Sequence, residues 1–391
     1  MKKKIQNVLI ILISIILGLY FLEILLTISK INSVKDIEKN ELTKLAKKLD
    51  LKFRTKYDEY FYQKQTNQKL LIAVNAAYKD QNVFHDYFPL GSISNTELLH
   101  CNENGYYSKY QSDKFGFNNN YKWKDKINIF EYVLLGDSYV HGACVNYKDT
   151  ITGNLQKLTL GNVINLGMSS TGPLIQFATL KEFSKIIKTN KYIWFYYDGN
   201  DLENLHDELK NSILLQYLNN EKFTQNILNN QNKSDILFKN ILNEEINLRK
   251  NNYKTKKNKF QKLITLHNLM RLKNNFTRQL QKEKIDKNSL LKTYEEILKK
   301  SLKITNQQNA ELILVYIPKT SAFTKNKSKN SYQEISNIAK KNNIRLINLE
   351  KIIRDNFKQP LELFPNLTRT EVHFNELGYK FVAKTVYNYS K

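Results

Sequence analysis

Short apolar segments alternate with amphipathic segments through most of the chain after residue 129. The apolar segments predict strands at 132–135, 162–165, 192–197, 312–317 and 345–349. The segments between them repeat apolar residues every three or four positions, which is typical of helices that cover a sheet. These predicted helices run at about 149–157, 174–187, 289–304, 331–341 and 376–389. Strands that alternate with helices predict a parallel sheet with helices on both faces.

Two regions depart from this alternation. Residues 84–123 are rich in aromatic and turn-forming residues, and the stretch Asp113–Phe117 predicts an ordered loop against the α/β domain. From about 202 to 285 the pattern is helical and polar, with eleven Lys or Arg and no acidic residue between 246 and 282. We expect a helical insertion there. It either packs on the core as a solvated hairpin, or lies on an anionic membrane or an acidic polymer.

The first 30 residues predict a membrane anchor. Three lysines at positions 2–4 precede an apolar run from Ile5 to about Ile28, and about 20 apolar residues match the thickness of a bilayer. Lysines at the start place that end in the cytoplasm. The alternative, a cleaved signal peptide, has a shorter apolar core and a small-residue cleavage site, which is absent here. We therefore expect a single-pass protein of the inner (cytoplasmic) membrane, with the rest of the chain in the periplasm.

Composition and motifs argue against nucleic acid binding and metal binding. The chain has 391 residues and a formal charge of +24, but no zinc-finger spacing, RNA-binding aromatic motif or phosphate-binding glycine loop accompanies that charge. We expect no nucleic acid partner. Six scattered histidines and two cysteines predict no metal site. In an oxidising compartment Cys101 and Cys144 either pair or stay free; a disulfide would tie the residues before the strand at 132–135 to those just after it.

Ser138 is the candidate nucleophile. It follows the strand at 132–135 in the tripeptide Gly136-Asp137-Ser138, and α/β folds place ligands at this edge of the sheet. A serine hydroxyl needs a base to take its proton. His373 is the candidate base, because it lies in a loop before the last predicted helix, whereas His141 is interpreted as local structure.

Four short blocks carry a family resemblance. Gly136-Asp137-Ser138, Asn165-Leu166-Gly167, Gly199-Asn200-Asp201 and His373-Phe374-Asn375 follow one another in the order seen in the SGNH/GDSL hydrolase family, and the layout resembles its membrane-anchored bacterial branch. The resemblance covers about 129–201 and 289–390. It implies a flavodoxin-like three-layer α/β/α fold with a parallel sheet and no cofactor.

The resemblance also implies roles for single residues. Ser138 would be the nucleophile and His373 the general base and acid. The oxyanion hole would consist of the backbone N–H groups of Ser138 and Gly167 and the side-chain amide of Asn200. The chain departs from the family where an aspartate normally precedes the histidine, because Thr370 and Glu371 stand there. Either Glu371 or a backbone carbonyl would then orient His373.

The expected protein is a membrane-anchored serine esterase that removes an O-acyl group from a carbohydrate or lipid. Two alternatives stay open: an O-acyltransferase acting on an envelope polysaccharide, and a non-catalytic protein that binds a glycan or a partner on a hydrolase scaffold. The expected domains are the anchor at 1–30, a stalk helix and aromatic loop region at 31–128, and a catalytic domain at 129–391 with the insertion at about 202–285. Substrate and oligomeric state stay open.

Overall fold

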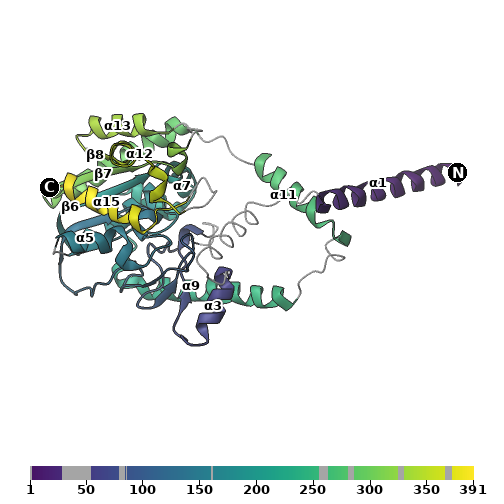
Figure 1. The fold of residues 1–391 in the computed structure, drawn as a ribbon, viewed down its shortest axis with the longest axis horizontal. Helices are drawn as coiled ribbons and strands as arrows, with labels where there is room; N and C mark the ends of the chain where they lie inside the picture. Colours follow the sequence, from purple (N-terminus) through teal and green to yellow (C-terminus); the bar gives the residue numbers. More distant parts are fainter. Residues whose placement is uncertain are drawn as a thin grey trace. The chain divides into compact units, whose positions relative to one another are not determined.

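The structure is a computed structural model that describes residues 2–28, 54–78, 84, 86–159, 162–254, 263–280, 286–324, 330–365 and 372–391. The chain divides into two compact units (Figure 1). The smaller unit comprises residues 1–40 and 243–285, and the larger comprises residues 41–242 and 286–391. The predicted insertion at 202–285 is therefore shared between the two units.

A five-stranded parallel sheet forms the centre of the larger unit. Its strands are β4 (Asn128–Leu135), β5 (Val163–Asn165), β6 (Ile187–Tyr197), β7 (Glu311–Ile317) and β8 (Arg345–Asn348). They lie in the order β5-β4-β6-β7-β8, and every neighbouring pair is parallel. Numbered along the chain within this sheet, the order is 2-1-3-4-5, which is that of flavodoxin-like folds. The predicted fold class is confirmed.

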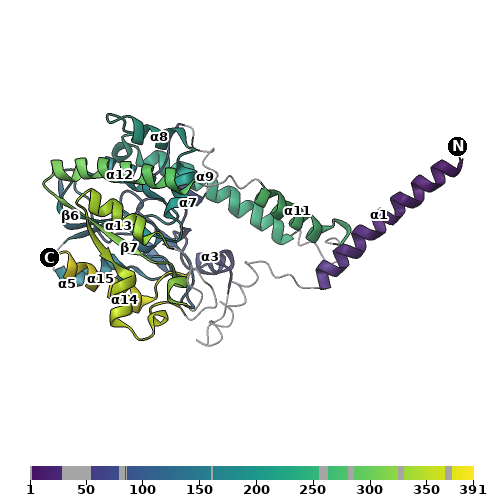
Figure 2. The same ribbon diagram turned by 90° about the horizontal axis from the view of Figure 1, so that it is seen from above.

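Helices cover both faces of this sheet (Figure 2). One face packs against α5 (Ile151–Thr159), α14 (Leu349–Asn356) and α15 (Glu376–Tyr389), whose apolar residues share one buried cluster with Ile193 and Phe195 of β6. The other face packs against α6 (Pro173–Phe183), α12 (Lys287–Gln307) and α13 (Tyr332–Lys341). There the Trp194 indole donates to Gln176 of α6, and the ring of Tyr196 contacts Tyr294 of α12. Because both faces are covered, the central strands are almost continuously apolar.

A small second sheet precedes the main one in the chain. It consists of β1 (Leu71–Ile72), β2 (Glu97–Leu99) and β3 (Lys109–Gln111), with β2 in the middle. Strands of two or three residues are too short to show a two-residue period, so the sequence alone predicts loop at 84–123. Of the predicted stalk, the described residues form α3 (Lys56–Lys64), whose start is capped by Thr55 and Asp58; residues 29–53 lie outside the described part.

Four further helices follow β6: α7 (Asp201–Glu208), α8 (Ser212–Asn219), α9 (Ile227–Lys254) and α11 (His267–Leu280). The short elements are α4 (Ser138–His141) and the 3-10 turns η1 (Ala76–Tyr78), η3 (Tyr147–Asp149), η4 (Thr320–Phe323) and η5 (Pro360–Leu363). The hydroxyl of Tyr217 in α8 donates to Glu182 of α6 over 2.7 Å. This part of the predicted helical region is therefore bound to the larger unit.

In the smaller unit, α1 (Lys2–Ile28) contains one stretch that can cross a membrane by its length and composition. This stretch, Gln6–Thr27, has 22 residues and a mean hydropathy of 2.8. Glu23 near its end is fully buried, and its carboxylate accepts hydrogen bonds from the backbone N–H groups of Asn268 and Leu269, each over 2.9 Å. Because the first N–H groups of a helix have no partner within it, Glu23 caps the start of α11.

Candidate active site

A sharp turn places Ser138 at the carboxyl end of β4. Gly136 has a φ of 155°, which side chains rarely tolerate, and an added Cβ would lie 2.6 Å from Val140 Cγ2. Asp137 then accepts the backbone N–H of Tyr139 over 3.0 Å and so caps the single turn α4. Because β5 and β6 flank β4 on opposite sides, the chain connections diverge here. Flavodoxin-like folds bind ligands at such a switch point.

His373, the expected base, lies against this serine. Its Nε2 is 2.8 Å from Ser138 Oγ. The loop that carries His373 is fixed by the hydroxyls of Tyr139 and Thr320, which both donate to the carbonyl of Val372, over 3.1 and 3.2 Å. The Ser138 side chain is buried, whereas a quarter of the His373 side chain is exposed. Solvent can therefore reach the imidazole of His373.

The other nitrogen of the imidazole contacts Glu103, a residue that the sequence did not indicate as part of the site. Glu103 Oε2 lies 3.1 Å from His373 Nδ1 and also accepts the backbone N–H of His373 over 2.8 Å. A carboxylate at Nδ1 keeps the proton on that nitrogen and leaves the lone pair of Nε2 facing Ser138. Glu371, the predicted orienting residue, lies outside the described residues. Nothing in the local sequence around Glu103 indicates that it meets a histidine 270 positions later.

A disulfide holds the segment around Glu103. Cys101 and Cys144 are joined, with their Cα atoms 4.7 Å apart. The side-chain amide of Asn104 adds a hydrogen bond to the carbonyl of Cys144 over 3.1 Å. The link therefore joins the residues before β4 to those after α4, which is the pairing that the two cysteines allow.

Gly167 occupies the predicted loop after β5, but its N–H already has an acceptor. It donates to Asn165 Oδ1 over 2.8 Å. An added Cβ at Gly167 would lie 2.5 Å from Val140 Cβ and 2.9 Å from the backbone nitrogen of His141. The absence of a side chain thus allows the loop to pack against α4. In this arrangement the Gly167 N–H is not free to bind an oxyanion.

Ser170, three residues later, has a different backbone. Its φ is 62°, in the left-handed region, and no acceptor for its N–H is found within the described part of the chain. The loop on which it lies is fastened beside Ser138, because the N–H of Met168 and the hydroxyl of Thr171 both bond to the carbonyl of Gly136, over 3.2 and 3.4 Å. Ser170 therefore presents a backbone donor on the loop where Gly167 was expected to do so.

Asn200 follows β6 and stands before the first residue of α7. Its side chain makes no capping hydrogen bond to that helix, and its Oδ1 is buried without a protein partner. The neighbouring Asp201 is fully buried and accepts the backbone N–H of Tyr197 over 2.9 Å. Burial, reinforced by the nearby Asp137, raises the pKa of Asp201 well above its usual value. Asp201 thus holds the turn, while the amide of Asn200 is left for another partner.

The Asp113–Phe117 turn is linked to the loop after β5 through a buried network. Asp113 accepts the backbone N–H groups of Phe115 and Phe117 and the side-chain amide of Asn119. The Asn119 side chain bonds in turn to both the N–H and the carbonyl of Asn165, over 2.9 and 2.8 Å. Burial raises the pKa of Asp113 to about 6. The turn therefore supports the loop that contains Gly167 and Ser170.

His141 also supports this loop, which agrees with its interpretation as local structure. Its Nδ1 lies 2.8 Å from Ser169 Oγ, and the ring of His100 lies against it with centroids 4.4 Å apart. Burial lowers the pKa of His141 to about 3, and lowers that of His100 well below its usual value. Both imidazoles are therefore neutral near pH 7 and act as hydrogen-bonding groups.

Glu103, Cys144 and His373 form a group whose potential metal-ligating atoms lie within 4.8 Å of one another. The sulfur of Cys144 is bonded to Cys101. It is therefore not a thiolate, the form in which cysteine binds metals. The residues present here suit an acid–base site rather than a metal centre.

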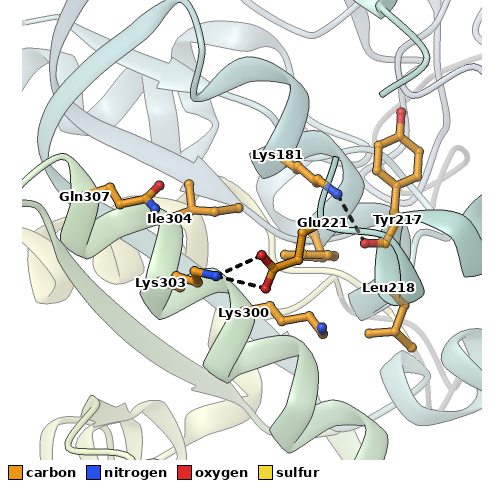
Figure 3. Close-up of a pocket in the computed structure, with 9 residues that line it drawn as sticks. Lys181, Tyr217, Leu218, Glu221, Lys300, Lys303, Ile304 and Gln307 are labelled. Carbon is orange, nitrogen blue, oxygen red and sulfur yellow. Dashed lines mark hydrogen bonds and ion pairs between the residues drawn. The ribbon is translucent and has the colours of Figure 1, made fainter. Parts of the chain in front are cut away.

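A pocket of the larger unit lies between α6, α8 and α12 (Figure 3). Lys181, Lys300 and Lys303 line it, and Glu221 pairs with Lys303 through contacts of 2.9 Å. Burial lowers the pKa of Lys181. Neither Ser138 nor His373 lines this pocket, which is separate from the candidate active site.

No family model matches the chain, and no curated protein matches its sequence. Solved structures do match. A lipolytic protein of the G-D-S-L family from Veillonella parvula is 11% identical, with a TM-score of 0.35, over 67% of this chain and 97% of its own. A lipase/acylhydrolase from Enterococcus faecalis is 13% identical, with a TM-score of 0.36, over 66% and 94%. An acetyl xylan esterase is 14% identical, with a TM-score of 0.36, over 67% and 100%. At these identities the likeness concerns the fold alone.

Proposed function

We propose that this chain is a serine hydrolase of ester bonds that works through an acyl-enzyme on Ser138. The observation that carries the proposal is the contact of 2.8 Å between Ser138 Oγ and His373 Nε2, on an imidazole whose other nitrogen meets a carboxylate. A nucleophile, a base and a group that orients the base are the components of a hydrolytic triad. Their arrangement at the switch point of a parallel sheet supports a ligand site there.

The geometry supports a two-step reaction. His373 Nε2 takes the proton of Ser138 as Oγ attacks the acyl carbon, and the imidazolium then gives that proton to the departing alkoxide. The alcohol leaves and the acyl group stays on Oγ. In the second step His373 takes a proton from water, the hydroxide attacks the acyl carbon, and Ser138 recovers its proton from the imidazolium. The carboxylic acid is released and the enzyme is unchanged.

Each attack places negative charge on the former carbonyl oxygen, which needs hydrogen-bond donors. We assign this role to the N–H of Ser138, the side-chain amide of Asn200 and the N–H of Ser170. Ser170 replaces Gly167 in this set because the Gly167 N–H is held by Asn165. Removing one such donor typically costs about 2.7–4 kcal/mol of transition-state stabilisation.

We further propose that α1 anchors the protein in the cytoplasmic membrane with the catalytic unit outside the cytoplasm. The apolar stretch Gln6–Thr27 and the lysines before it support this orientation. The Cys101–Cys144 disulfide supports it too, because disulfides persist in oxidising compartments. In that location the accessible esters are O-acyl groups on carbohydrates of the cell envelope and on lipids.

The experiment is hydrolysis of a short-chain aryl ester by the full-length protein in detergent. We expect Ser138→Ala and His373→Ala to abolish turnover. Ser184→Ala, a serine at the end of α6, is the matched control and should keep full activity. Turnover by Ser138→Ala at the wild-type rate would refute the mechanism. Acetylated oligosaccharides and a diacyl phospholipid, tested under the same conditions, distinguish the two classes of substrate.

A further inference from the structure

We propose that Glu103 is the positioning residue for His373, and that the Cys101–Cys144 disulfide holds it in place, so that hydrolysis depends on the oxidised disulfide. The inference rests on the proposed esterase function and concerns the same site. It assigns the third role of the triad to a residue that precedes the nucleophile in the chain, rather than to one beside the histidine.

The contacts of Glu103 fix both the ring and the backbone of His373. One carboxylate oxygen, Oε2, receives the backbone N–H over 2.8 Å and faces Nδ1 over 3.1 Å. Because the same oxygen of Glu103 contacts both the backbone nitrogen and the ring nitrogen of His373, it fixes the rotation of the imidazole about its side-chain bonds. The Glu103 side chain is only 7% exposed, so water competes little for these contacts. The charge of the carboxylate also favours the imidazolium that forms when Ser138 loses its proton.

The loop that carries Glu103 is closed at its base by short hydrogen bonds. The N–H of Ser108 donates to the carbonyl of Cys101 over 2.9 Å, and the N–H of Gly105 donates to Asn102 Oδ1 over 2.9 Å. These bonds define the shape of the loop but do not attach it to the nucleophile. The disulfide and the Asn104 contact to the carbonyl of Cys144 provide that attachment.

The other end of the disulfide adjoins the turn of the nucleophile. Cys144 follows Ala143, whose N–H donates to the carbonyl of Ser138 over 2.9 Å. The carboxylate and the nucleophile are thus connected through a few residues and one S–S bond, although 35 positions separate Glu103 from Ser138 in the sequence. A dithiol reductant would convert the two sulfurs to thiols and itself become a disulfide. The loop would then be held only by hydrogen bonds.

Glu103→Gln is the first test, with Glu131→Gln, an exposed position on β4, as the matched control. We expect Glu103→Gln to lower kcat by about 10²–10⁴-fold, since replacing the triad aspartate of a serine protease by its amide costs about 10⁴-fold. KM should change little, and Glu103→Asp should restore part of kcat. Without the carboxylate the imidazole protonates less readily, so the acidic limb of the kcat/KM profile should move to lower pH. A purely structural defect would not move this limb.

The disulfide is tested by a double-mutant cycle. Cys101→Ser with Cys144→Ser, or treatment of the wild type with dithiothreitol, should lower kcat with the far-UV circular dichroism unchanged. In the Glu103→Gln background, loss of the disulfide should lower kcat little further, because the disulfide acts on His373 only by holding Glu103 in place. Equal losses in the two backgrounds would refute the coupling between the disulfide and Glu103.

The remaining outcomes separate this inference from the proposed function. If the wild type shows no turnover, or if Ser138→Ala stays active, the proposed esterase function is refuted. An active wild type with an inactive Ser138→Ala and a fully active Glu103→Gln overturns the role of Glu103 alone, as does a loss of activity confined to Glu371→Gln.

Proton NMR gives a readout without substrate. A downfield Nδ1–H resonance should be present in the wild type and absent from both Glu103→Gln and His373→Ala, and its persistence in Glu103→Gln would contradict the inference.

Discussion

Gly167→Ala should destabilise the protein, because the structure leaves no room for a methyl group at this position. The added Cβ would lie 2.5 Å from Val140 Cβ, 2.6 Å from Val140 Cγ1 and 2.9 Å from the backbone nitrogen of His141. A side chain can rotate away from such a contact, but the backbone nitrogen cannot. Forcing extra atoms into a well-packed site typically costs about 1–3 kcal/mol.

The same substitution should also lower activity. Val140 and His141 belong to the single turn that begins with Ser138, so a loop pushed away from them displaces the nucleophile relative to its donors. Thermal unfolding and hydrolysis of the aryl ester are measured on the same preparation. Each 1 kcal/mol should lower the unfolding midpoint by about 2–4 °C for a domain of 150–250 residues, and by less for a larger unit. Ser170→Ala, on the same loop, is the control and should leave the unfolding midpoint close to that of the wild type.

Whether Gly167→Ala lowers or raises the unfolding midpoint decides between two roles for Gly167. Alanine keeps the N–H, so a glycine needed only as a backbone donor would tolerate the change. At a site with room for the methyl group, Gly→Ala usually stabilises by about 0.4–1 kcal/mol through the unfolded chain. A midpoint at or above that of the wild type, with activity retained, would refute the close packing of this loop against α4.

Three further substitutions test the loops and the buried histidines. Asn200→Ala should lower kcat by about 10²–10³-fold at nearly constant KM, and an unchanged kcat would exclude its amide from the oxyanion hole. Ser170→Gly should keep kcat and raise the unfolding midpoint, because a left-handed residue with a side chain costs about 1–2 kcal/mol; a lower midpoint would contradict this. Because burial lowers the pKa of His141 to about 3, the folded state binds fewer protons than the unfolded state between about pH 6.5 and that value. The contribution of His141 to stability should fall by up to about 1.4 kcal/mol per pH unit as pH drops through this window, so the urea midpoint of the wild type should fall relative to that of His141→Asn.

Long apolar runs made the main sheet predictable. The stretch 192–197 is apolar without interruption, and the structure buries it on both faces as the end of β6. The strands β1–β3 were missed because two or three residues carry no periodicity. The segment that contains Glu103 lies between β2 and β3 and contacts His373.

The proposed catalytic pair, Ser138 and His373, could be predicted because each residue lies in a recognisable local context. Ser138 follows a strand and His373 precedes a helix, and each context can be recognised without the other. Glu103 has no such context. It reaches His373 only through the packing of a loop and a disulfide, with 270 positions between the two residues. The family resemblance instead implied an orienting group just before the histidine, which left Glu371 or a backbone carbonyl for this role.

The loop that contains Gly167 and Ser170 shows a second limit of the sequence. The family resemblance implied that Gly167 is a backbone donor, and a glycine suits a place where backbone must approach a reacting group closely. In the structure Gly167 instead provides space for α4, while the left-handed position belongs to Ser170. Serine rarely adopts this conformation, so its sequence position carried no signal.

Covalent labelling of Ser138 tests the central claim most directly. The folded, full-length protein is treated with a fluorophosphonate, which bonds to activated serine hydroxyls, and the modified peptide is identified by mass spectrometry. The account predicts one labelled residue, Ser138, with labelling lost in Ser138→Ala and strongly slowed in His373→Ala. Folded wild-type protein that stays unlabelled at Ser138, or that is labelled equally fast without His373, would contradict it.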